Sequence, residues 1–110
     1  MIGGDDLYIF QMDLTGDFKV GRSSNVARRL TEVQTGCPHN LRMILHAPGH
    51  GHEELKVHAD LRKYRCRARS GEWFREEGLG FIPTHLYDMF TEEVLETPDW
   101  WKQKKGGFKC

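Results

Sequence analysis

The polar and apolar positions of the chain predict three short β-strands in its first half. Residues 7–12 and 18–22 form two runs of strand-forming residues around a turn, which is the pattern of a β-hairpin. Residues 41–46 predict a third strand, because apolar residues fall on alternate positions and would share one side of it. Those residues are Leu41, Met43 and Leu45.

The rest of the chain shows helical spacing in three places. Residues 23–36 begin with serine and asparagine, which cap helices, and end at Gly36 shortly before a proline. A second helix is expected from His52 to about Tyr64, and a third from Pro83 to Pro98. Together these elements predict an α+β fold in which helices flank a small central antiparallel three-stranded sheet.

Length and composition favour one small domain. The chain has 110 residues, of which 38% are hydrophobic, so residues 1–98 suffice for one core, while residues 99–110 form a basic tail expected to fray. No apolar run is long enough for a membrane span, and the first residues do not resemble a signal peptide. The three cysteines are scattered rather than paired. We therefore expect an intracellular protein without a membrane partner.

The charges are balanced in number but not in position. The chain carries 16 basic and 16 acidic side chains, yet residues 19–29 and 62–69 contain bases and no acid. A local cluster of this kind attracts phosphates even when the net charge is zero. The second run, here called the basic segment, contains Arg62, Lys63, Arg65, Arg67 and Arg69. The alternative is that both runs are ordinary solvated surface.

Helical phase separates neighbouring polar residues. In the first predicted helix Arg29 falls at the border of the apolar stripe, whereas Arg28 points to solvent. In the second, Glu54 and His58 share the face that carries Val57 and Leu61. Glu53 lies a quarter turn away from that face. A carboxylate and an imidazole on a core-facing stripe indicate function, although a Glu54–His58 hydrogen bond at the edge of the core would also explain them.

Several short motifs follow one another along the chain. Leu-Tyr-Ile occupies residues 7–9, Lys-Val-Gly residues 19–21, and Arg29 follows ten residues after Lys19. A Glu-x-x-x-His motif at 54–58 and Gly-Glu-Trp-Phe at 71–74 complete the series. This series resembles the GIY-YIG nuclease superfamily, most closely a phage- and bacteria-associated DNA-binding subfamily, with Leu-Tyr-Ile in place of Gly-Ile-Tyr, Lys-Val-Gly in place of Tyr-Ile-Gly and Arg29 at the spacing of the superfamily's arginine. The resemblance covers residues 7 to about 77. It implies that the hairpin brings Tyr8 to Lys19 and that Gly21 permits close backbone approach.

The resemblance implies a DNA endonuclease that uses one divalent metal ion, Mg2+ or Mn2+. Tyr8 would accept a proton from the attacking water if Lys19 and a second cation lower a phenol pKa that starts near ~10. Arg29 would bind the scissile phosphate in a bidentate manner, and Glu54 would hold the metal. Arg22 would contact phosphate, and His58 would transfer a proton or assist the leaving group.

Departures from the pattern leave alternatives open. Asp6 replaces the leading glycine of the first motif, Lys19 replaces a tyrosine, and no late asparagine is found. A catalytically silent DNA-binding module of the same fold is therefore the alternative function. Glu72 is the alternative metal ligand. Because the chain has no separate recognition domain, a protein partner would supply any narrow specificity.

Histidines gather in the stretch from His46 to His58, which raises the question of zinc. No Cys-x-x-Cys pair is present, and the histidine spacing fits no standard zinc motif. We therefore expect the histidines at 46, 50 and 52 to be loop residues near phosphate rather than ligands. Trp73 and Phe74 are expected to pack in the core rather than to stack on DNA bases.

Overall fold

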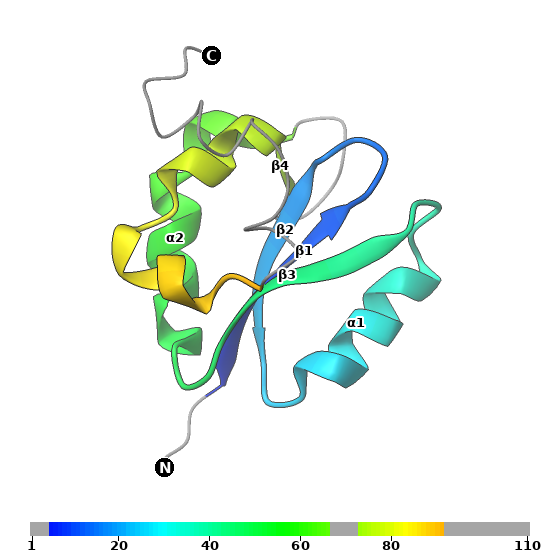
Figure 1. Ribbon diagram of the computed structural model, residues 1–110, viewed down its shortest axis with the longest axis horizontal. Coiled ribbons are helices and arrows are strands. Elements are labelled where there is room, and N and C mark those ends of the chain that lie inside the picture. The colour runs from blue at the N-terminus through cyan, green and yellow to red at the C-terminus, as the bar shows by residue number, and fades with distance from the viewer. Residues whose placement is uncertain (1–4, 67–72, 92–110) are drawn as a thin grey trace.

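The computed structural model describes residues 5–66 and 73–91, which form a sheet between two helical layers (Figure 1). The sheet has four strands in the order β3-β1-β2-β4, and every pairing is antiparallel. The strands are β1 (Asp6–Met12), β2 (Phe18–Ser23), β3 (Leu41–Ala47) and β4 (Trp73–Phe74). The α+β class is thus confirmed, and the Trp-Phe pair adds a short fourth strand to the three expected.

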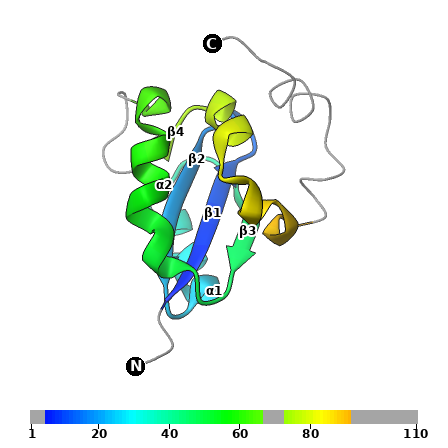
Figure 2. The ribbon, with the colours of Figure 1, turned by 90° about the vertical axis from the view of Figure 1, so that its left-hand side faces the viewer.

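One helix covers one face of the sheet, and the remaining helical segments cover the other (Figures 1 and 2). Helix α1 (Val26–Thr35) lies on the first face and is capped by the Asn25 side chain, which accepts a hydrogen bond from the Arg28 backbone N–H. The second face is covered by one α-helix and several 3-10 turns. These are η1 (Gly51–Glu53), α2 (Glu54–Asp60), η2 (Arg62–Tyr64), η3 (Glu76–Phe81) and η4 (Thr84–Met89).

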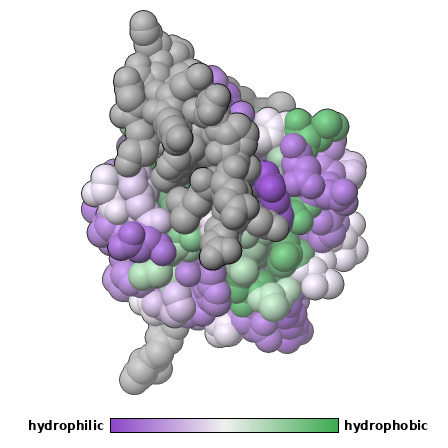
Figure 3. All heavy atoms as spheres, viewed as in Figure 1, coloured by the Kyte–Doolittle hydropathy of each residue, from purple (hydrophilic) through white to green (hydrophobic). Residues whose placement is uncertain are grey.

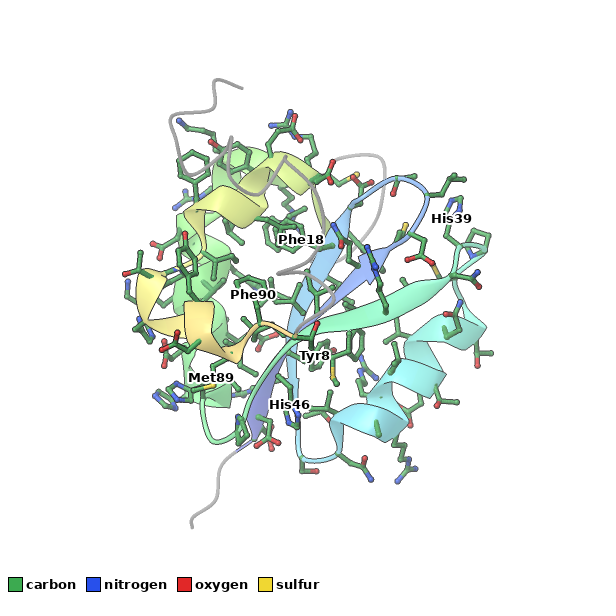
Figure 4. All side chains as sticks on the ribbon, in the orientation of Figure 1. Tyr8, Phe18, His39, His46, Met89 and Phe90 are labelled. Atoms are coloured by element: carbon green, nitrogen blue, oxygen red, sulfur yellow. The ribbon has the colours of Figure 1, made fainter. Side chains whose placement is uncertain are left out.

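The two faces bury cores of unequal size. The larger core fills the face under α2 and the 3-10 turns, and includes Phe18, Val20, Leu61 and Phe90. A smaller cluster under α1 contains Tyr8, Phe10 and Val26. Figure 4 shows Tyr8 on the side of α1, with Phe18 and Phe90 on the side of the other helical segments. Alternation along β1 explains the division, since Tyr8 and its neighbours Leu7 and Ile9 point to opposite faces.

The strict alternation predicted for the third strand is wrong. Phe10 pairs with Met43 whereas Ile9 pairs with Leu45, so Ile44 is an additional residue that forms a β-bulge. As a result Ile44 and Leu45 both join the larger core, and Met43 packs against the smaller one. The bulged residue also uses its carbonyl oxygen to accept a hydrogen bond of 2.8 Å from the Thr91 backbone N–H.

The second and third predicted helices differ from the structure in extent. The helix expected from His52 to Tyr64 is α-helical only in α2. The 3-10 turns η1 and η2 lie before and after it, and such turns are frequent at the ends of α-helices. The third is the 3-10 helix η4 rather than an α-helix in the described residues, and it ends at Met89, because Phe90 is extended and forms an antiparallel bridge with Leu45. Tertiary pairing with the edge of β3 therefore overrides the helical pattern. Residues 92–98 and the predicted tail lie outside the described residues.

Hydrophilic and apolar residues are unevenly distributed on the face seen in Figure 3. Hydrophilic residues lie mainly around its outline, and apolar residues show on the side formed by β3 and α1. None of the described helices has the length and apolar character needed to cross a membrane. Among the described residues, Cys37 and Cys66 are free thiols.

Candidate functional site

Tyr8 and Gly21 are directly opposed on β1 and β2, and this pairing positions the phenol. The Tyr8 side chain is only 1% exposed and stacks on Phe10 with ring centroids 4.0 Å apart. A Cβ atom at position 21 would lie 2.3 Å from the Tyr8 hydroxyl oxygen, which is closer than any real contact. Glycine is therefore required at position 21 because the tyrosine lies across its backbone.

Arg29 reaches the same phenol from α1. Its Nε donates a hydrogen bond of 3.4 Å to the Tyr8 hydroxyl, and its Nη1 donates one of 3.3 Å to Glu32. The hydrogen bond and the attraction to the Tyr8 oxygen raise the pKa of the Arg29 guanidinium above its ordinary value. Arg28, in contrast, has a side chain that is 76% exposed and pairs only with Glu32 among the described residues. Helical phase thus predicted correctly which arginine turns inward.

Lys19 lies on the same face of the sheet, two residues before Gly21. It pairs with Phe10 across the hairpin, and its ammonium group lies 5.8 Å from the centroid of the Trp73 ring. Trp73 pairs with Lys19 in β4, while Phe74 is buried in the larger core. The sequence prediction that both aromatic residues are core anchors therefore holds for Phe74, whereas Trp73 contacts the lysine at the surface.

A second polar group gathers at the outer edge of β2. Glu54, at the start of α2, is 20% exposed, with Oε1 3.6 Å from the Arg22 Nε and Oε2 3.8 Å from the His58 Nε2. The His58 Nε2 donates a hydrogen bond of 2.8 Å to the carbonyl oxygen of Val20. The hydrogen bond considered between Glu54 and His58 is therefore absent, since 3.8 Å is too long for one. His58 instead fixes α2 to β2, which leaves only Nδ1 for the predicted proton transfer.

These two groups meet at three consecutive residues of β2. Tyr8 lies over Gly21, His58 binds Val20, and Glu54 faces Arg22, so the backbone of residues 20–22 lies between the groups. Within the described chain, β4 pairs only with the first two residues of β2, and the edge beyond them carries no strand. The site residues predicted from separate motifs thus flank the same three residues of β2, of which Val20 and Gly21 are buried and Arg22 is exposed.

Glu53 contacts a different set of residues from Glu54. Its side chain is 15% exposed and contacts His50 and His85. Sequence reasoning missed this cluster because His85 is far along the chain and lies in η4. His50, which was expected to be a loop residue near phosphate, instead contacts the Glu53 carboxylate.

The predicted DNA-binding residues are only partly within the described structure. Arg62, Lys63 and Arg65 are exposed after the end of α2, and the Arg22 side chain, in β2, is 53% exposed. The remaining predicted residues lie outside the described residues, and so does the alternative metal ligand. These are Arg67, Arg69 and Glu72.

Comparison with known proteins corrects the family suggested by the motifs. No curated protein and no solved structure is significantly similar to the chain. The family model that matches is the T5orf172 domain, over residues 7–102. Assignment to the GIY-YIG nuclease superfamily is therefore wrong, because the matching model describes a distinct family and spans nearly the whole chain. The chain belongs to the T5orf172 domain family.

Proposed function

We propose that the protein binds DNA and hydrolyses its phosphodiester bonds with one divalent metal ion, Mg2+ or Mn2+. The observation that carries the proposal is the Arg29 guanidinium hydrogen-bonded to the Tyr8 hydroxyl above Gly21. A carboxylate, Glu54, lies across the same segment of β2. Hydrolysis of a phosphodiester requires a group that accepts a proton, positive charge beside the phosphate and an oxygen ligand for a metal. An intracellular location, where DNA is found, follows from this function.

Tyr8 and Arg29 would act on the water and the phosphate. The Arg29 guanidinium donates a hydrogen bond to the Tyr8 hydroxyl, so its positive charge would support a Tyr8 phenolate that accepts a proton from water. The Arg29 side chain is 44% exposed, so its guanidinium would donate hydrogen bonds to two phosphate oxygens. Lys19, on the same face of the sheet, adds positive charge to this side of the site.

Glu54 fits the requirements of a metal ligand. Its carboxylate is partly exposed, and the nearest nitrogens of Arg22 and His58 lie 3.6 and 3.8 Å from its oxygens, which is beyond hydrogen-bonding distance. Mg2+ is commonly held by one or two carboxylates together with waters and substrate phosphates. When bound, the ion would supply a Lewis acid to the phosphate. Arg22 faces the same carboxylate and would bind an adjacent phosphate.

The exposed arginine and lysine side chains of the basic segment support DNA as the substrate. Arg62 and Lys63 lie in η2, immediately after the helix that carries Glu54, and Arg65 follows them. Phosphate contacts of this kind fix a duplex in place without reading its sequence. Narrow specificity would then come from a protein partner.

A catalytically silent DNA-binding protein is the second candidate. The observation that favours it is the burial of Tyr8, whose side chain is 1% exposed and therefore has almost no direct access to water. In this case the Tyr8–Arg29 hydrogen bond would hold α1 against the sheet, and DNA would contact only the exposed basic side chains.

A plasmid assay separates the two functions. Supercoiled plasmid is incubated with the protein and Mg2+, Mn2+ or EDTA, and both nicking and gel retardation are measured. Metal-dependent nicking supports the first candidate, and retarded but intact plasmid supports the second. Plasmid that is neither cut nor retarded at low salt contradicts both.

Paired variants then test the residues. Glu54→Gln and Tyr8→Phe should each lower nicking on the order of 100-fold, because each group acts on charge that develops in the transition state. Asp60→Asn is the control for Glu54, since Asp60 is an exposed acid at the other end of α2. Arg28→Ala is the control for Arg29→Ala. Nicking at the parental rate by Glu54→Gln would refute its role as the metal ligand.

A further inference from the structure

A cluster of two histidines and one glutamate lies on the face of the sheet covered by α2 and the 3-10 turns, and its residues have no part in the proposed cleavage of DNA. Glu53 Oε2 lies 2.5 Å from the His50 Nδ1, and Glu53 Oε1 lies 2.6 Å from the His85 Nε2. The three ligand atoms lie within 4.8 Å of one another. In Figure 1 η4, which carries His85, and the start of α2 lie on the same side of the sheet. Two segments distant in sequence thus converge on one carboxylate.

The local structure holds this arrangement in place. His50 is the residue before η1, and its carbonyl oxygen accepts a 2.9 Å hydrogen bond from the Glu53 backbone N–H. Glu53 is 15% exposed, while the His50 and His85 side chains are 31% and 53% exposed. The two histidines hold the pKa of Glu53 below its ordinary value, with His50 as the larger cause. The carboxylate is thus held between two partly exposed histidines.

Two imidazole nitrogens and a carboxylate are a donor set that suits Zn2+. Zinc binds histidine nitrogen at about 2.0–2.1 Å, so ligand atoms around a tetrahedral ion are about 3.3 Å apart. The present separations of 2.5 to 4.8 Å bracket that value, and side-chain rotations would reach it. Each nitrogen that now faces Glu53 would lose its proton on binding the metal. Water would complete the coordination.

We propose that His50, Glu53 and His85 form a Zn2+ site that fastens η4 to the turn after β3. One contact in the site joins Glu53 to His85, which are 32 positions apart in the chain. Metal binding would stabilise the folded protein, because the unfolded chain does not hold the three ligands together. The site is separate from Glu54, which faces Arg22 and His58 instead.

The test is Zn2+ binding by the full chain, measured by isothermal titration calorimetry after treatment with EDTA, with thermal unfolding in parallel. We expect one Zn2+ per chain at this site and a higher melting temperature with the ion. Outer partners of metal ligands typically change affinity 10–100-fold, so loss of a direct ligand in His85→Ala or His50→Ala should exceed about 100-fold.

Two further variants make the result decisive. Glu53→Gln keeps an oxygen that accepts a hydrogen bond but lacks the ionised carboxylate, so its metal-free form should melt near the parent while its zinc-dependent shift is lost. His52→Ala removes a histidine whose ring lies 6.1 Å from that of His50 but which is outside the ligand group, and it should bind like the parent. Absence of binding by the parent, parental affinity in Glu53→Gln, or an equal loss in His52→Ala would overturn the proposal. Glu54→Gln should keep Zn2+ binding whether or not it cuts DNA, so the two proposals fail independently.

Discussion

Replacing Gly21 with alanine tests the close approach on which the candidate site depends. The new methyl group would lie 2.3 Å from the Tyr8 hydroxyl oxygen and 2.5 Å from Cζ. Non-bonded heavy atoms prefer separations of about 3.5–4.0 Å, so the ring or the strand must move by about 1 Å or more. The ring has little room to move, because it is 1% exposed and stacks on Phe10.

The magnitude follows from two opposing terms. Overpacking a well-filled site costs about 1–3 kcal/mol. Alanine recovers about 0.4–1 kcal/mol by restricting the unfolded chain, because Gly21 does not need a positive φ. We therefore expect Gly21→Ala to lower the free energy of unfolding by about 1–2 kcal/mol. For a domain of this size each kcal/mol corresponds to roughly 4–8 °C in melting temperature.

Gly36→Ala is the matched control, since it is the same chemical change in open space. A Cβ atom at position 36 meets nothing within 4 Å, and its φ of −95° suits alanine. Urea denaturation followed by circular dichroism should show this variant unchanged or slightly stabilised. In a Tyr8→Leu background the cost of Gly21→Ala should shrink, because the atoms that collide are gone. Equal stability of the two glycine variants, or an undiminished cost in that background, would refute the reasoning.

Three other predictions concern stability and binding. His46 holds the pKa of Asp6 below its ordinary value through a 2.8 Å hydrogen bond. The ionised Asp6 therefore stabilises the fold fully above the ordinary carboxyl pKa near ~3.9, and this stabilisation is lost as pH falls through the lower pKa of the folded state. Between pH 5 and pH 3, urea titrations should show a smaller loss in the free energy of unfolding for Asp6→Asn than for the parent. Asn25→Ala removes the cap of α1 and should cost about 0.5–2 kcal/mol in the same assay, whereas Ser24→Ala should cost little. Glutamine at the three described positions of the basic segment should weaken DNA binding and reduce the salt slope by up to about 3, measured by fluorescence anisotropy at several salt concentrations, and an unchanged slope would place the DNA elsewhere.

Local patterns predicted the first half of the molecule best. The hairpin, the helix capped at its start and the strand after it follow from period, caps and turns, and the structure has all of them. The error in β3 arises because the bulge at Ile44 depends on the pairing of β3 with β1. The order of apolar and polar residues within β3 does not reveal it. The same holds for Phe90, whose helical pattern yields to a bridge with Leu45.

The motifs were less reliable for the family than for the positions. They suggested a superfamily that the family match contradicts, yet the short spacings directed attention to Tyr8, Gly21 and Arg29, which the structure brings together. Helical phase supports the choice of Arg29 without any family argument, because a helix on the sheet must turn one side inward.

By itself, the sequence determined the elements whose causes are local: the strands around the hairpin, the helix phase of Arg28 and Arg29, and the glycine that the phenol requires. Only the tertiary structure decided which residues distant in the chain share a site. It placed His58 on the Val20 carbonyl and brought His85 to Glu53, thirty-two positions earlier. Such contacts arise when elements distant in the chain pack on the same face of one sheet, and no periodicity within an element records what the next element will place beside it.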